Sequence, residues 1–121
     1  MDNSTTGSIQ VAGESIPLDP EGYLVKMSDW STEVAEALAA REGRALDERH
    51  WEVLRVLRDF YQEYELSPAM RPFTKAVKLA LGSDKGSSLY LMKLFPEHDT
   101  AESPARIGAR LAGLPKPTNC H

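Results

Sequence analysis

The stretch DERHWEVLRVLRDFYQEY, residues 47–64, is the part of the sequence that decides the fold. Its large apolar side chains recur at spacings of three and four residues, the period of an amphipathic α-helix. They are Trp51, Leu54, Leu57, Tyr61 and Tyr64. An aromatic box for a cofactor is one interpretation of this stripe, but helical spacing of this kind is far more typical of core packing. The sequence therefore predicts a helix here, capped by Asp47, around which the rest of the chain packs.

Cap signals divide the remainder of the chain into four more helices. Toward the N-terminus, a helical period runs over residues 29–43 and ends at Gly43, a residue typical of helix C-termini. Toward the C-terminus, Ser67-Pro68 and Ser103-Pro104 each join an N-cap serine to a proline at the first helical position. These pairs predict helices over 67–82 and 103–113. A shorter helix is expected over 86–94, closed by Pro96.

The first residues of the chain have a different period. Ile9, Val11, Ile16 and Leu18 alternate with polar residues around a Gly13 turn, which predicts a β-hairpin. Residues 1–7 are small and polar and are expected to be frayed. The predicted fold class is mainly α. It is a small orthogonal bundle of about five helices with an N-terminal β-hairpin, forming a single domain over 1–121 with a flexible C-terminal arm.

Composition limits the cellular setting. Apolar residues make up 41% of 121 residues, enough for a core without disulfides or a structural metal. The single cysteine excludes a disulfide within the chain and suits a reducing compartment. No apolar stretch approaches the ~20 residues that a membrane span requires, and the first fifteen residues do not resemble a signal peptide. We expect a cytoplasmic protein that makes no membrane contact.

The net charge of −4 is unevenly distributed along the chain. Residues 1–70 carry a net charge of −8, whereas residues 71–121 carry +4. Such asymmetry indicates either a solvated helix face or a basic surface that meets an acidic partner or nucleic acid. Arg71, Lys75 and Lys78 stand at positions i, i+4 and i+7, which places them on one face of a predicted helix. Four further basic residues lie later in the sequence. The candidate partner-binding residues are Arg71, Lys75, Lys78, Lys85, Arg106, Arg110 and Lys116.

Conventional catalytic and metal sites are not indicated. His50, His98 and His121 do not stand at zinc-ligand spacings, and one cysteine cannot complete such a set. His50, beside Trp51 at a helix start, is interpreted as a structural histidine. The sequence contains no phosphate-binding glycine loop and no evident acid–base carboxylate pair. We expect neither a metal nor a cofactor.

The cysteine itself is the candidate catalytic residue because of its position. Cys120 lies in a C-terminal arm, residues 113–121, beyond Pro115 and Pro117, which favour an extended path. An incidental surface thiol is the alternative interpretation. Sulfur transfer, however, requires a thiol that enters another protein's active site, because the thiolate attacks in line and access limits the rate. Lys116 favours the thiolate form electrostatically and the neighbouring terminal carboxylate opposes it, so the sequence leaves the direction of the shift open.

Several sequence blocks, in order, resemble the DsrC/TusE family of sulfur-relay proteins. Their order and the C-terminal string AGLPKP followed by a cysteine are the specific features. The blocks are LDPEGYL at 18–24, DW at 29–30, HWEVLRVLRDFYQEYELSPAMR at 50–71, YLMKLFP at 90–96 and AGLPKPTNC at 112–120. The resemblance implies a helical fold with an N-terminal hairpin and a sulfurtransferase-type activity in which Cys120 accepts and passes on sulfur as a persulfide.

One position separates the two branches of that family. Members that serve dissimilatory sulfite reductase carry a second cysteine eleven residues before the last one, and here that position is Ala109. The resemblance therefore implies the single-cysteine, TusE-like branch. Members of that branch take sulfur from a TusBCD-type (DsrEFH-type) complex and give it to MnmA, a tRNA 2-thiouridylase, so that any contact with tRNA is indirect.

Two other functions remain open from the sequence. One is a single-cysteine carrier that serves sulfur oxidation or a sulfite reductase-type partner. The other is a DNA-binding regulator that uses the helix–turn–helix-like segment 67–94. The net acidity, and the scarcity of Arg, Asn and Gln in the second helix of that segment, count against DNA binding.

Overall fold

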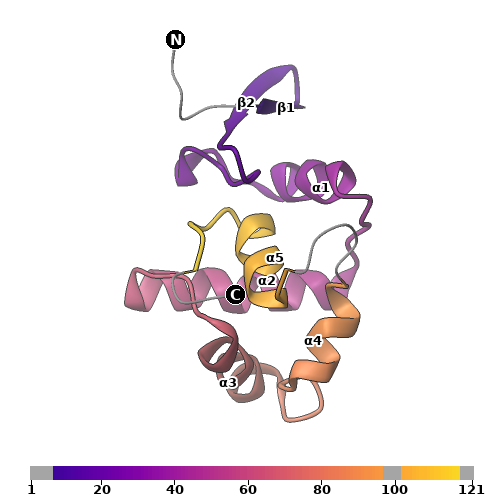
Figure 1. Cartoon of the computed structure of the whole chain (residues 1–121), viewed down its shortest axis with the longest axis vertical. Helices are drawn as coiled ribbons and strands as arrows, with labels where there is room; N and C mark the ends of the chain where they lie inside the picture. Colours follow the sequence, from indigo (N-terminus) through magenta and orange to yellow (C-terminus); the bar gives the residue numbers. More distant parts are fainter. Residues whose placement is uncertain (1–6, 97–101, 118–121) are drawn as a thin grey trace.

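A computed structural model of the chain describes residues 7–96 and 102–117. Two antiparallel strands precede five α-helices, which confirms the predicted fold class. Figure 1 shows the hairpin at one end of the molecule, α3 and α4 at the other, and α5 crossing α2 between them. The elements are β1 (Gly7–Val11), β2 (Glu14–Leu18), the short 3-10 helix η1 (Met27–Asp29), α1 (Thr32–Arg41), α2 (Glu48–Tyr64), α3 (Met70–Leu81), α4 (Ser88–Leu94) and α5 (Pro104–Leu111).

The hairpin follows directly from its turn. Ala12 and Gly13 both have positive φ, 51° and 82°, as a two-residue turn of the primed type requires. Ile9 pairs with Ile16 in the resulting register, and both side chains are buried. A third extended segment is limited to a single bridge between Leu18 and Leu24. The hairpin thus adds one apolar face to the core, and α1 lies against β1.

Helix α2 begins as predicted, and the predicted stripe faces the core except at its C-terminal end. The Asp47 side chain accepts a hydrogen bond from the backbone N–H of Arg49 (2.9 Å), and the Asp47 N–H donates to His50 Nδ1 (3.1 Å). The stripe prediction is wrong at its end, because Tyr64 is 54% exposed. Trp51 and Tyr61 are only half-buried. The buried residues of α2 are His50, Val53, Leu54, Val56 and Leu57.

His50 is a structural residue, as expected. Because Nδ1 accepts from the Asp47 backbone, the ring proton is on Nε2, which donates to the Leu94 carbonyl at 2.9 Å. The imidazole also meets the Phe95 ring edge-on at 5.4 Å. His50 therefore joins the start of α2 to the end of α4.

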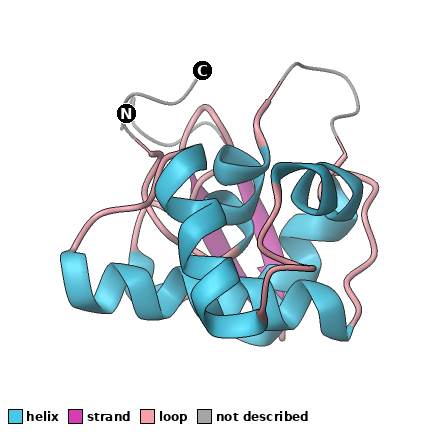
Figure 2. Cartoon of the chain, turned by 90° about the horizontal axis from the view of Figure 1, so that it is seen from below, coloured by secondary structure: helices cyan, strands magenta, loops and turns pink. Residues whose placement is uncertain are grey.

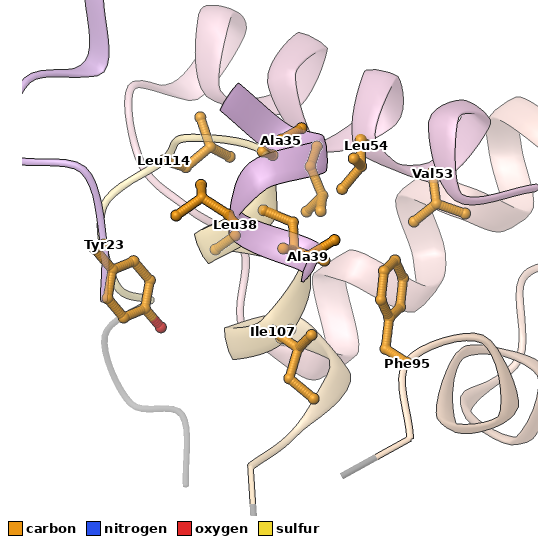
Figure 3. Close-up of a cluster of buried hydrophobic side chains, with 14 of the residues drawn as sticks. Tyr23, Ala35, Leu38, Ala39, Val53, Leu54, Phe95, Ile107 and Leu114 are labelled. Atoms are coloured by element: carbon orange, nitrogen blue, oxygen red, sulfur yellow. The ribbon is translucent and has the colours of Figure 1, made fainter. Parts of the chain in front are cut away.

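Helix α5 is the centre of the core. Its Ala105, Ile107, Ala109 and Leu111 are fully buried, and the helix contacts α1, α2 and α3. Figure 3 shows Ile107 and Leu114 pointing into the same cluster as Leu38 of α1 and Leu54 of α2. Figure 2 shows the helices massed on one side of the short hairpin. Burying one such leucine side chain is worth about 2 kcal/mol, so the segment around α5 is firmly held.

Two helices begin later than predicted, and the residues left outside them have other contacts. Helix α1 begins at Thr32, capped by Ser31, so Trp30 is not helical. Helix α3 begins at Met70 with Ala69 as its N-cap, so the predicted capping role of Ser67 is wrong. Helix α5 does begin as predicted, with Ser103 as N-cap and Pro104 at the first position. In the described part of the chain, no helix is long and apolar enough to cross a bilayer.

Candidate functional site

The arm root, residues 112–117, is where the chain leaves the core. Helix α5 ends in a Schellman motif: the Gly113 N–H donates to the Arg110 carbonyl (3.2 Å) and the Leu114 N–H donates to the Ala109 carbonyl (2.9 Å). Gly113 has φ +75°, and Leu114 is only 2% exposed. The motif reverses the chain tightly, so that the arm root turns back over α2 (Figure 1).

Trp30 closes one side of the arm root. Its indole Nε1–H donates to the Leu111 carbonyl at 2.9 Å, satisfying one of the carbonyls that the helix end leaves open. A Cβ on Gly113 would overlap the same indole ring. Glycine is therefore required at position 113 by its backbone conformation and by the space that Trp30 occupies.

Arg58 closes the other side. Its guanidinium donates to the Ala112 carbonyl at 2.7 Å and lies 4.0 Å from the centre of the Trp30 ring. Partial burial lowers the pKa of Arg58 from its ordinary value, although an arginine still remains charged at neutral pH. Arg58, Trp30 and the end of α5 thus form one assembly that combines charge-assisted hydrogen bonding with a cation–π contact.

The rest of the arm root is held near the start of α3. The buried Ser67 hydroxyl donates to the Pro115 carbonyl at 2.5 Å. Lys116 pairs with Glu21 at 3.0 Å, and Pro117 is buried. Residues 113–117 therefore have contacts with the folded domain, although Pro115 and Lys116 are exposed; the mobility expected of the arm from residue 113 stays a prediction. Cys120 lies outside the described residues.

Two of the candidate partner-binding arginines have partners inside the molecule. Arg110 is 6% exposed and pairs with Glu42 (2.7 Å) and Glu102 (2.7 Å). Burial opposes its charge, but these hydrogen bonds raise the pKa of Arg110 well above its ordinary value. Arg106 pairs with Glu21 at 2.9 Å. The guanidinium of Arg110 is therefore already buried and paired, and a docking role for these arginines stays a prediction.

The other candidates divide by position. Lys85 is paired with Glu52 at 2.9 Å, and Lys116 with Glu21, the acid that also binds Arg106. Arg71, Lys75 and Lys78 are exposed along α3, and together they line a groove of about 770 Å³. We call these three residues the basic face. The structure therefore brings Arg106 and Lys116 together at Glu21 and leaves the basic face as a separate surface.

Metal binding finds no support in the part of the chain that the structure describes. No group of three or more His, Cys, Asp or Glu side chains is close enough there to hold an ion. The residues that sequence reasoning missed are Trp30, Arg58 and Ser67, which hold the arm root. The string AGLPKP indicated that the arm root is important. No local sequence pattern indicated that Trp30, Arg58 and Ser67 contact it.

These features define a small helical protein whose core fixes the base of a C-terminal arm, and the chain is similar to known proteins. A family model described as DsrC like protein matches residues 10–121. The sulfurtransferase TusE of Pectobacterium atrosepticum is 46% identical over 112 residues, covering 93% of this chain and 98% of that protein. The sulfurtransferase TusE of Escherichia coli K12 is 45% identical over 108 residues, with coverages of 89% and 94%.

A solved structure agrees with these relatives. The NMR structure of Allochromatium vinosum DsrC superposes with a TM-score of 0.83 at 43% identity, covering 95% of this chain and 98% of that one. The chain belongs to the DsrC-like protein family, and the resemblance found in its sequence is confirmed.

Proposed function

We propose that the chain is a sulfur-relay protein that accepts a persulfide sulfur on Cys120 and passes it on. The observation that carries the proposal is the arm root. Contacts from Trp30, Arg58, Ser67 and Glu21 hold residues 112–117, and the only cysteine of the sequence follows three residues after Pro117. A thiol so close to a fixed point is suited to delivery into a partner's active site.

The chemistry needs no cofactor or external oxidant. The Cys120 thiolate attacks the outer sulfur of a persulfide on the donor protein; the new S–S bond forms as the donor's S–S bond breaks, and the donor leaves as a thiolate. One S–S bond is made for each one broken, so the exchange involves no net oxidation. In a second exchange, the thiolate of the acceptor's cysteine attacks the outer sulfur of the Cys120 persulfide. The sulfur passes to the acceptor and Cys120 leaves as a thiolate.

Position 109 supports a mechanism with one thiol. The Ala109 side chain is fully buried within α5, and its carbonyl accepts the Leu114 N–H. With alanine there and one cysteine in the sequence, the arm has no second thiol with which to form a disulfide within the chain. Each S–S bond that Cys120 makes during the relay is therefore to another protein or to the carried sulfur.

The proposed route runs from a TusBCD-type complex to a tRNA 2-thiouridylase of the MnmA type. It is supported by identities of 45–46% to proteins named sulfurtransferase TusE over most of both chains. Such a relay works in the cytoplasm, where the tRNA is modified. The likeness to Allochromatium vinosum DsrC favours one alternative, a carrier in sulfur oxidation. Ala109 excludes a two-thiol form of that alternative but not a single-cysteine one, so the preference for the tRNA route rests on the identity to the TusE proteins.

Intact mass spectrometry tests the carrier function. After incubation with the persulfide-loaded TusBCD-type complex, the chain is expected to gain the mass of one sulfur atom, and Cys120→Ala is expected to gain none. Failure of every persulfide donor to load the wild-type chain would contradict the proposal. Measuring 2-thiouridine in tRNA from a deletion strain then decides the route, because an unchanged level would favour the sulfur-oxidation alternative.

A further inference from the structure

Helices α3 and α4 carry a charge opposite to that of the protein as a whole. Residues 70–94 contain five lysines and arginines and one acidic residue, Asp84, in a chain whose net charge is −4. The two helices themselves contain no Asp or Glu. A surface with so little internal neutralisation produces a positive potential that attracts acidic surfaces from a distance.

The cations of the basic face also lack partners among the described residues. No ion pair is found there for Arg71, Lys75 or Lys78, whereas Lys85, Arg106 and Arg110 are all paired. Their charges are therefore available to another molecule without first breaking an internal pair. Lys93 of α4 is likewise exposed and has no ion pair among the described residues, so the available charges of the C-terminal half lie on α3 and α4.

Exposed apolar side chains accompany these charges. Leu79 is 78% exposed and lines the same groove as Lys75 and Lys78. On α4, Leu89 and Met92 are 61% and 50% exposed. Neighbouring exposed leucine and methionine side chains are typical of protein interfaces, whose centres are apolar and whose rims are polar.

We propose that the exposed surface of α3 and α4, which includes the basic face, is the docking site for a partner protein. The partner's contacting surface is acidic with an apolar centre, and within the relay the partner is the persulfide donor. The inference rests on the proposed function. Single-stranded RNA recognition relies on exposed aromatic rings that stack on bases, but Phe73 of α3 is buried and Tyr90 of α4 is half-buried. An acceptor that binds tRNA must itself be basic near its substrate, so it would be repelled by this face.

The position of the face suits sulfur transfer. Ser67, which holds the Pro115 carbonyl, precedes α3 by three residues, so α3 starts beside the arm root. Arg71 is in the first turn, and Lys78 is about 10 Å further along the helix axis. Covalent geometry limits Cys120 to within about 11 Å of Pro117. A donor that covers the basic face is therefore within range of the thiol.

The test uses full-length chains in which Arg71, Lys75 and Lys78 are all changed to Glu. A matched control changes Lys26, Arg41 and Arg55 to Glu, since these are exposed cations of other elements and their replacement alters the net charge equally. Circular dichroism and thermal unfolding establish that both variants fold. The first readout is the rate of sulfur loading from a persulfide-loaded TusBCD-type complex.

At low ionic strength, the α3 variant is expected to be loaded at least about tenfold more slowly than the control, with the difference shrinking as salt is added. Inorganic polysulfide, which needs no docking, is expected to load both variants at the same rate. Affinity for the donor, measured with Cys120→Ala as the background, is expected to fall in the α3 variant. This binding measurement needs no sulfur, so it tests docking even if the carrier function fails.

Three results would overturn the inference. One is equal donor affinity and equal loading for the α3 variant and the control. Another is a defect confined to discharge onto the thiouridylase, which would assign the face to the acceptor. The third is tRNA binding by the wild-type chain that the α3 variant loses while donor loading is unchanged, which would make the face a nucleic-acid surface.

Discussion

The basic residues of two regions of the molecule, the surroundings of α5 and the exposed side of α3, differ in how their charges are used. Around α5 and the arm root, Arg58 and Arg110 are turned inward, onto the Ala112 carbonyl and onto Glu42 and Glu102. On α3, Arg71 and Lys78 are exposed and have no ion pair among the described residues. The same residue types thus serve stability in one region and are free for association in the other.

This difference predicts opposite responses to substitution and salt. Removing an inward-facing arginine takes a charged hydrogen-bond donor away from partly buried carboxylates or from a carbonyl, so the free energy of unfolding should fall. Removing an outward-facing cation should leave stability almost unchanged and should affect association, which salt screens.

Arg110→Ala is expected to have the largest effect. It leaves Glu102 and Glu42 without their shared guanidinium, and breaking a buried pair from one side costs about 3 kcal/mol or more. Urea unfolding monitored by circular dichroism measures the loss. Lys78→Ala, in the exposed region, serves as the control. A loss below about 1 kcal/mol for Arg110→Ala would show that the two regions do not differ as described.

Gly113→Ala is expected to cost about 2–4 kcal/mol, because the left-handed backbone conformation is strained for alanine and the new Cβ overlaps Trp30. Gly13→Ala is the matched control. Gly13 has a similar φ of +82°, but no atom lies within 4 Å of the point that an alanine Cβ would occupy, so only the backbone cost of about 1–2 kcal/mol remains. Equal losses in thermal unfolding would mean that Trp30 does not press on the arm root.

Ser67→Ala is expected to lower stability by about 1 kcal/mol, the typical net value of one hydrogen bond. Because Ser67 fixes Pro115, we also expect sulfur transfer from the protein donor to slow severalfold, while loading by inorganic polysulfide stays unchanged. Ser67→Thr keeps the hydroxyl and should restore the rate. A Thr variant as slow as the Ala variant would show that the hydrogen bond does not position the arm.

Changing Arg71, Lys75 and Lys78 together to Gln is expected to have the smallest effect on stability, within about 0.5 kcal/mol, because these side chains are exposed. Sulfur loading from the donor should instead become slower and nearly independent of ionic strength. Stopped reactions at several salt concentrations, analysed by mass spectrometry, measure this. A rate that keeps the wild-type salt dependence would place the electrostatic attraction elsewhere on the chain.

Local signals in the sequence predicted the elements well. The Asp47 cap, the Ser103-Pro104 helix start and the hairpin turn were all recognisable, because each depends on residues within a few positions of one another. Ser67-Pro68 has the same local pattern as Ser103-Pro104 but does not cap its helix. Its hydroxyl donates instead to a carbonyl 48 positions away, and no local rule contains that information.

The surroundings of the candidate site were predictable only in part for the same reason. Cys120, predicted from its place in the AGLPKP block, lies outside the described residues, and the exposure of the basic face agrees with the helical spacing. The burial of Arg110 did not follow, because its partner Glu42 is 68 positions away in the sequence. Trp30 was expected to lie on a helix face, but the helix begins after it and its indole caps α5 instead. In each case, contacts with residues far away in the sequence determined the position of the side chain.

The fixed arm root also has a consequence for the concentration at which the thiol acts. Whatever conformation residues 118–120 adopt, Cys120 stays within about 11 Å of Pro117 as long as the arm root holds. For a partner already docked beside α3, the thiol is then present at an effective concentration at or above the millimolar values typical of short linkers. In the proposed relay, the contacts of Ser67, Arg58 and Trp30 thus make sulfur transfer to a docked partner resemble an intramolecular reaction. A thiol on a protein that is not docked reacts only at its concentration in bulk solution.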